Sequence, residues 1–299
     1  MANGSNPTKV EHFVPRMYLR RFCEPSQKKD KPAHMIWAYD VKEMCQKQIP
    51  IETVCFETDL YELKDASNNI VEQNKIEKAL SRHEKDFSEF IETISKRAKL
   101  DGNLNTSCFL TANEKAAFIG WMCLQISRYP TTISSAEEVA TEMALTNDEP
   151  NSARNYAIER CLDLFFNGKI DKEKPGLPLH IGHWFKNKAF VIGRSSQPLL
   201  FTSDSPVYLL HTERDSVNFN IEGPQKIIFP LSSTLALFML PYDKENCGRR
   251  NILIDLSEDN ICEVQWSMAC SAKRWIFSSQ QFTDKQIALI KSAREDKHG

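Results

Sequence analysis

Apolar residues recur at helical spacing through much of the first half of the chain. Steps of three and four between residues 72 and 100 predict one long amphipathic helix. Thr111 and Glu114 have the spacing of a capping box, and the apolar run after them predicts a buried helix that ends before Pro130. Two further helices are expected near residues 134–147 and 151–166.

The second half of the chain follows a different pattern, in which short apolar runs are separated by turn residues. Such runs predict the strands of a mostly antiparallel sheet, here at residues 190–192, 199–201, 207–210, 227–229, 235–240 and 275–277. Strand-like runs also occur early, at residues 35–40 and 51–63, while helical spacing returns at residues 257–272 and 283–294. The expected fold class is α+β, with a helical first half packed on a mostly antiparallel sheet from the second half.

The polar residues 1–11 are predicted to form a disordered tail. A hydrophobic content of 41% in 299 residues is enough for a substantial core. We therefore expect residues 12–299 to form a single integrated domain, with the loop at residues 167–178 as its only candidate boundary.

Charge and composition narrow the classes of partner. With 38 basic and 40 acidic side chains the formal net charge is -2, so no global field recruits nucleic acid or an anionic membrane. Any anion must therefore bind locally. No apolar run is long enough to suggest a membrane span, and nine scattered cysteines without a CxxC pair favour free thiols in the cytoplasm.

The segment from His12 to Phe22 is the first candidate for a functional site. Pro15 predicts a helix start, whose positive end would favour a neutral imidazole at His12 that can act as a base or ligand. Arg16 and Arg20 stand four apart, where like charges repel by roughly 0.2–0.5 kcal/mol unless an anion faces them. Both arginines are expected to point inward, toward a pocket.

A second candidate is the polar cluster at residues 202–206, between two apolar runs. Ser203 and Asp204 could display reactive groups at a strand end, or they could simply form a turn. A third candidate is the pair Gln125 and Arg128 at the end of the buried helix. Arg128 could form a buried ion pair or a helix cap, or it could clamp an anion.

The remaining polar candidates carry weaker signals. Glu77 and Glu84 flank the apolar stripe of the long helix, where they are either solvated or face a cleft. His83 lies on the stripe itself, where a hydrogen-bonded core imidazole is the simpler interpretation. His180 and His183 have the spacing of two metal ligands, but no nearby cysteine or carboxylate completes a set, so we predict no metal site.

Familiar catalytic motifs are absent from the sequence. There is no GxSxG, no Walker loop, no GxGxxG after a strand and no HExxH. These absences argue against the commonest hydrolases, kinases and dinucleotide enzymes. A basic stripe with interleaved aromatic residues, as in modules that bind nucleic acid, is also missing.

Five short motifs in order resemble those of one family, the uncharacterised domain-of-unknown-function family 4238. They are the HFVPxxYLxxF opening, the glutamate-bearing long helix, QxxRxP at residues 125–130, the TSDxP turn at residues 202–206 and the PLS element at residues 230–232. Position 205 carries serine where this family often has asparagine. The resemblance spans nearly the whole chain but brings no established biochemistry with it.

The resemblance does imply which polar residues matter, namely His12, Arg16, Arg20, Glu84, Gln125, Arg128, Ser203 and Asp204. As a set they suit phosphoester chemistry, with His12, Glu84 and Asp204 in catalysis and the other five residues binding substrate. The first hypothesis is thus a hydrolase acting on a phosphate-containing substrate, such as a nuclease-like effector, with any cofactor unknown and a divalent metal left open.

Two other hypotheses stay open. The same residues could form a non-catalytic module that recognises an anion or nucleotide, with phosphate or nucleic acid as partner. Alternatively, they could be caps and buried ion pairs that only stabilise the fold. The sequence does not determine the oligomeric state.

Overall fold

The computed structural model describes residues 10–24, 34–100, 108–143, 149–167, 176–185, 188–210, 224–241 and 251–296. The chain divides into two compact units. Unit 1 comprises Met1–Phe13, Cys55–Phe87 and Phe118–His183, and unit 2 comprises Val14–Val54, Ser88–Ala117 and Trp184–Gly299. Because both units are built from separated segments, the expectation of one integrated domain over residues 12–299 stays a prediction.

Unit 1 contains a short two-stranded ribbon and most of the helices of the first half. Strand β1 (Val10–His12) pairs with β4 (Phe56–Thr58) in antiparallel register. Val10 and Glu11 thus belong to a strand, inside the segment that we expected to be a disordered tail, while residues 1–9 lie outside the described part. The helices of this unit are α4 (Pro130–Glu142), α5 (Ser152–Phe166), α6 (Leu177–Trp184, apart from its last residue) and parts of α2 (Lys75–Leu100) and α3 (Ala112–Ser127).

The sequence explains where these helices begin and how they pack. Thr111 and Glu114 form the predicted capping box, in which each side chain accepts the other residue's backbone N–H at 3.2 and 2.7 Å. Helix α4 begins at Pro130, earlier than predicted, because proline at the first helical position needs no hydrogen-bond partner for nitrogen. In the core of unit 1 the rings of Phe87 and Trp121 stack with centroids 4.1 Å apart.

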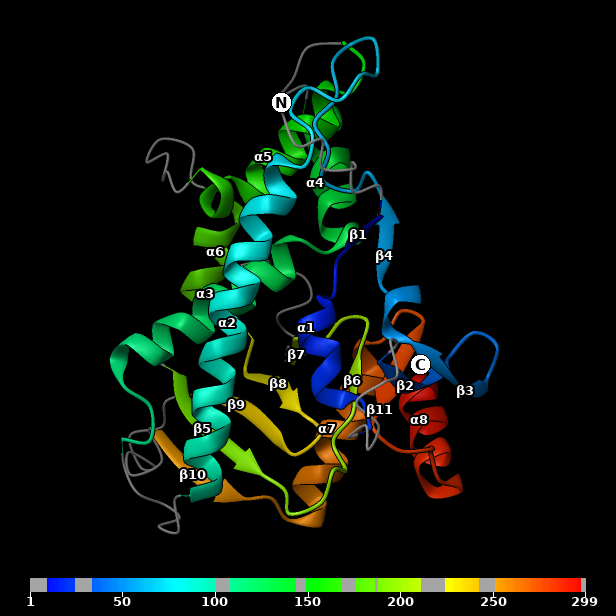
Figure 1. The fold of residues 1–299 in the computed structure, drawn as a ribbon, viewed down its shortest axis with the longest axis vertical. Helices are drawn as coiled ribbons and strands as arrows, with labels where there is room; N and C mark the ends of the chain where they lie inside the picture. Colours follow the sequence, from blue (N-terminus) through cyan, green and yellow to red (C-terminus); the bar gives the residue numbers. More distant parts are fainter. Residues whose placement is uncertain are drawn as a thin grey trace, which may run out of the picture. The chain divides into compact units, whose positions relative to one another are not determined.

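Unit 2 holds two sheets (Figure 1). The larger one has the order β10-β5-β9-β8-β7 and is antiparallel except where β10 runs parallel to β5. Its strands are β5 (Lys188–Arg194), β7 (Tyr208–Leu210), β8 (Lys226–Ser232), β9 (Leu235–Pro241) and β10 (Asn251–Asp255). The smaller sheet is antiparallel throughout, with the order β3-β2-β11-β6. Its strands are β2 (Met35–Asp40), β3 (Cys45–Pro50), β6 (Thr202–Ser203) and β11 (Trp275–Ser278).

Two helices at the end of the chain pack on these sheets. Helix α7 (Glu258–Ser271) begins with a capping box between Ser257 and Asn260, and α8 (Asp284–Asp296) packs against it. Val264 of α7 joins the apolar cluster of the larger sheet, whereas Met268 joins the cluster of the smaller one. Helix α7 therefore contributes to the apolar clusters of both these sheets.

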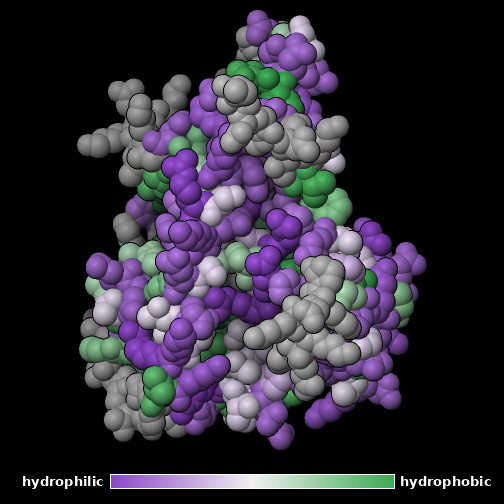
Figure 2. Space-filling view, in the orientation of Figure 1, coloured by the Kyte–Doolittle hydropathy of each residue, from purple (hydrophilic) through white to green (hydrophobic). Residues whose placement is uncertain are grey.

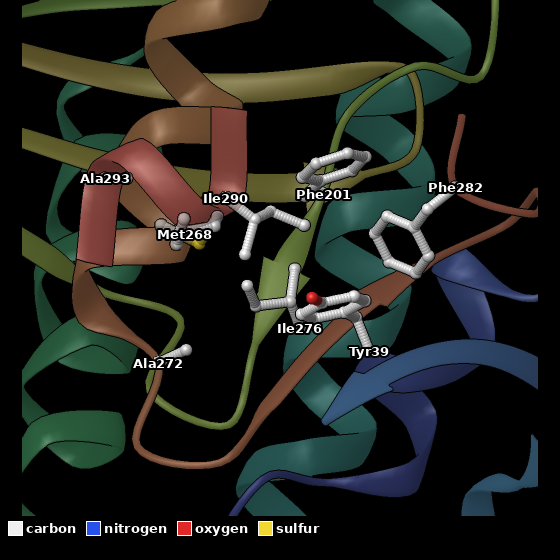
Figure 3. Packing of buried hydrophobic residues seen from close by; sticks show 9 residues of the cluster. Tyr39, Phe201, Met268, Ala272, Ile276, Phe282, Ile290 and Ala293 are labelled. Atoms are coloured by element: carbon white, nitrogen blue, oxygen red, sulfur yellow. The ribbon is translucent and has the colours of Figure 1, made fainter. Parts of the chain in front are cut away.

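The core of the smaller sheet is drawn in Figure 3. Here the ring of Phe282 meets those of Tyr39 and Phe201 edge-on, with centroids 5.9 and 5.0 Å away. Ile276 of β11 and Ile290 of α8 are fully buried in the same cluster. Burying an aliphatic side chain of this size contributes about 1.5–3 kcal/mol, so this cluster stabilises the sheet and both helices together.

The described elements confirm an α+β fold with mostly antiparallel sheets. The structure differs from the sequence-based expectation in three ways. The described strands of unit 2 form two sheets in place of one, with the β1–β4 ribbon as a third in unit 1. Strands β3 and β10 and helix α6 were not predicted, and the apolar run at residues 199–201 precedes a strand without being part of it. Residues 51–63 contain a single turn of 3-10 helix, Ile51–Thr53, and only the short strand β4.

The face of the molecule in Figure 2 is mainly hydrophilic, with apolar residues in small groups. Among the described residues, no helix has both the length and the apolar character that crossing a membrane requires.

Candidate functional site

Arg128, just after the last residue of α3, is the centre of a buried polar cluster in unit 1. Its side chain is completely buried, and its backbone N–H donates to Leu124 at 2.9 Å, so the helical turn reaches this residue. One guanidinium nitrogen, Nη1, lies 2.8 Å from Oε1 of Glu84, and Nε donates to the Tyr61 hydroxyl at 3.3 Å. The third nitrogen, Nη2, donates to the backbone carbonyl of His12 at 2.6 Å.

These partners keep Arg128 charged inside the protein. Burial lowers the pKa of the guanidinium, but Tyr61 and Glu84 more than offset this effect, and the pKa of Arg128 is raised overall. Burial also raises the pKa of the Tyr61 hydroxyl, which therefore stays neutral and donates to the Arg128 carbonyl at 2.9 Å. The ion pair with Glu84 is thus part of a hydrogen-bonded network.

The same cluster fixes the backbone of β1 and the residue after it. Gln125, one helical turn before Arg128, donates from Nε2 to the carbonyl of Phe13 at 2.7 Å. The two side chains therefore bind the consecutive carbonyls of His12 and Phe13, and the Phe13 N–H donates to Cys55 at 2.9 Å. We call this arrangement of Gln125 and Arg128 on the two carbonyls the carbonyl clamp.

Glu11 adds a carboxyl group that the sequence analysis missed. It is 1% exposed, and its Oε2 accepts the backbone N–H of Tyr61 at 2.8 Å. Burial raises the pKa of Glu11 to about 7, helped by the charges of Glu62, Glu77 and Asp59 and opposed by the Tyr61 N–H. The sequence gives no signal for this burial, because Val10, the apolar residue beside Glu11, is the exposed one of the two.

His12 enters the cluster differently from the way we predicted. Its backbone carbonyl, and not its imidazole, is the group that Arg128 binds. The half-buried imidazole lies beside Phe56 of β4, with ring centroids 5.6 Å apart. A role for this ring as base or ligand therefore stays a prediction.

Ser203 and Asp204 belong to unit 2, where both are buried at the end of β6. The Asp204 carboxylate accepts the backbone N–H groups of Lys273, Arg274 and Trp275 at 2.8, 2.7 and 3.0 Å. Ser203 shares a hydrogen bond with Ser271 at 2.9 Å. Asp204 therefore shapes the chain between α7 and β11, and its oxygens are already occupied by these amides.

Arg16 and Arg20 are also in unit 2, and the prediction that they point inward is wrong because both are exposed. Helix α1 (Arg16–Leu19) is a single turn that continues as 3-10 helix over Arg20–Phe22. The apolar side of this segment is buried, and Tyr18 and Phe22 anchor it. Tyr18 contacts the Thr202 hydroxyl and donates to the Pro230 carbonyl, both at 2.7 Å, and Phe22 is fully buried.

The structure thus brings four of the eight predicted site residues into one cluster and places the other four in unit 2. The cluster contains His12, Glu84, Gln125 and Arg128, and unit 2 contains Arg16, Arg20, Ser203 and Asp204.

The other candidate histidines lie outside this cluster. His83 bonds through Nε2 to the Phe165 carbonyl at 2.8 Å, as a core imidazole would, and His180 and His183 are exposed on α6. Within the described ranges, no group of three or more His, Cys, Asp or Glu side chains is arranged to hold a metal ion.

The network around Arg128 predicts a large loss of stability when the guanidinium is removed. Arg128→Ala leaves the Glu84 carboxylate and the His12 carbonyl without their donor and should cost about 3–5 kcal/mol in the free energy of unfolding. Arg82→Ala, a matched change at an exposed arginine of α2, should stay within about 0.5 kcal/mol of wild type. Urea unfolding of the three proteins measures both values, and a cost below 1 kcal/mol for Arg128→Ala would contradict the clamp.

Asp204 gives a second stability prediction, this time in unit 2. Asp204→Ala removes the acceptor of three backbone donors, each of which costs about 1–3 kcal/mol when buried without a partner. We expect a loss of at least about 3 kcal/mol, and Asp204→Asn should lose less because it keeps one acceptor oxygen. Ser205→Ala is the control, and thermal unfolding with equal midpoints for Asp204→Ala and this control would refute the assignment.

Comparisons with known proteins place the chain in a family. The family model described as "Protein of unknown function (DUF4238)" matches residues 11–282, which is most of the chain. No curated protein and no solved structure matches it. The match starts at Glu11 of β1 and ends at Phe282, so it includes both the carbonyl clamp and the Asp204 turn. The chain belongs to the DUF4238 family of proteins of unknown function.

Proposed function

We propose that this protein is a cytoplasmic module that recognises a phosphate-containing ligand through Arg16 and Arg20, without turnover. The observation that carries the proposal is that both arginines are exposed and form no ion pair with any described residue. Most of the other predicted site residues, by contrast, are already engaged by groups of the protein itself.

The position of the two arginines supports anion binding. The Arg20 N–H donates to the Arg16 carbonyl, so the two side chains leave the chain one helical turn apart. Two guanidiniums at this spacing repel each other, and an anion between them removes that repulsion. Each planar guanidinium can bind phosphate through two hydrogen bonds.

The turn that carries both arginines is rigidly held, which lowers the entropy cost of binding. Tyr18 and Leu19, between the two arginines, are buried, and the Tyr18 ring stacks on Phe229 with centroids 5.5 Å apart. A fixed backbone leaves only the two arginine side chains to be ordered by the ligand. The cytoplasmic location rests on Cys45 and Cys108, which are exposed free thiols and favour a reducing compartment.

A hydrolase acting on a phosphate-containing substrate, for example a nuclease-like effector, is the second candidate. The observation that favours it is the buried carboxyl group of Glu11. Burial raises the pKa of this group to about 7, which suits a group that takes up and releases protons near neutral pH. Against it stand Glu84 and Asp204, since the first is paired with Arg128 and the second is held by three amides.

The two candidates are separated by one set of variants. We expect inorganic phosphate, nucleotides or a short oligonucleotide to stabilise the wild type, by about 2.7 kcal/mol for a ligand at 100 times its dissociation constant. The double change Arg16→Ala and Arg20→Ala should weaken binding at least tenfold, or about 1.4 kcal/mol. Thermal shift and calorimetric titration measure both effects.

The control removes two positive charges elsewhere in unit 2, by Lys285→Ala with Lys291→Ala on the exposed side of α8. Its affinity should match the wild type. Equal binding by the arginine double variant would refute the proposal. Release of inorganic phosphate or cleaved oligonucleotide by the wild type but not by Glu11→Gln would establish the hydrolase in its place.

A further inference from the structure

The short strand β1 is held to the rest of unit 1 partly through the carboxyl group of Glu11, which is buried where a charged carboxylate is disfavoured. Glu11 is the central residue of β1, which Figure 1 shows beside β4. Its side chain is 1% exposed and accepts the Tyr61 N–H at 2.8 Å, and it forms no ion pair with any described cation. A carboxylate in such a site loses its hydration without gaining an opposite charge.

The charged groups around Glu11 are mostly acidic. In the antiparallel register Glu11 lies directly opposite Glu57 of β4, and like charges in opposed positions destabilise a strand pair. From the following segment Asp59 and Glu62 act on it, and from α2 Glu77 does. Of the nearby described cations, Arg128 is already paired with Glu84 and bonded to the neutral hydroxyl of Tyr61, while Lys64 and Lys78 act on Glu62. His12, the next residue of β1, is also titratable, and strand alternation places it on the other face of β1.

We propose that β1 is a proton-controlled strap: with a proton on Glu11 the segment from Val10 to Phe13 stays bound to unit 1, and loss of that proton promotes its release. The proposal concerns the segment itself and is independent of anion binding at Arg16 and Arg20.

The interactions of the strap allow it to open without the rest of unit 1. β1 has three residues and one pairing strand, β4, which is itself only three residues long. The other attachments in the described part of the chain include the carbonyl clamp on His12 and Phe13, the Phe13 N–H bonded to Cys55, and ring contacts of His12 with Phe56 and of Phe13 with Tyr129. Segments with so few contacts open with a much smaller free energy than the global unfolding of a domain.

The direction of the pH effect follows from linkage. The pKa of Glu11 is raised from 4.5 to about 7 in the bound strap, chiefly by burial. The bound state therefore holds the proton more tightly, and the stability of the strap is greatest below pH 4.5. It falls as the pH rises from 4.5 toward 7 and is constant above that range.

Hydrogen exchange of the full chain, with amide rates corrected for their intrinsic pH dependence, tests the strap. The probes are the amides of Phe13 and Tyr61, which donate to Cys55 and to Glu11. Between pH 5.5 and 8 the opening constant at Phe13 should rise about 30-fold in the wild type. Glu11→Gln has no proton to lose and should remove this dependence.

Glu57→Gln is the matched control, because it removes a carboxylate at an exposed position of the partner strand. It should retain most of the wild-type dependence. The proposal fails if the wild type shows no change with pH or if Glu11→Gln changes as the wild type does. It also fails if the buried Met122 amide of α3 loses protection in parallel, because the opening is then not local. If Glu11→Gln does not fold, the test rests on the wild type alone: the opening constant must rise with pH at the Phe13 amide and not at the Met122 amide.

Discussion

The arrangement of unit 1 depends on one buried positive charge, the guanidinium of Arg128. A charge in the interior is tolerated only where its hydrogen-bonding groups and its charge are both satisfied. Arg128 achieves this by joining α2 through Glu84, the segment after β4 through Tyr61, and β1 through the carbonyl of His12. Three segments that are far apart in sequence are therefore fixed relative to one side chain.

The carbonyl clamp explains in structural terms two of the sequence motifs that led us to the DUF4238 family. The QxxRxP motif supplies the two donors of the carbonyl clamp, and Pro130 starts α4 immediately after it. The opening motif supplies the two carbonyls that the clamp binds. The two motifs, more than a hundred residues apart, are thus the two halves of one structural interaction. The TSDxP turn has a separate role, since Asp204 organises the chain around β11 through backbone amides.

Sequence pattern was sufficient to predict three elements: α2 from its helical periodicity, α3 from its capping box and apolar run, and β2 from its run of β-forming residues. It failed for β3, whose residues are mostly polar because this strand is at the edge of its sheet and is largely exposed. The separation into two sheets was equally inaccessible, since strand order depends on contacts between segments distant in sequence.

The candidate site, like the fold, was only partly predictable from the spacing of residues along the sequence. Helical spacing correctly suggested that Gln125 and Arg128 act together, and a buried ion pair was one of the interpretations that it allowed. The sequence could not show that their acceptors are backbone carbonyls, because every residue carries such a group. Glu11 was missed for a related reason, since its burial follows from the pairing of β1 with β4.

Because the carbonyl clamp binds main-chain atoms, it does not depend on which side chains stand at positions 12 and 13. The position of this strand can therefore be inherited while its side chains diverge. The clamp alone imposes no requirement for histidine at position 12. Proteins with the same QxxR pair could present different side chains from this strand on an unchanged backbone, which makes β1 a place where related proteins can acquire different surface chemistry at little cost to folding.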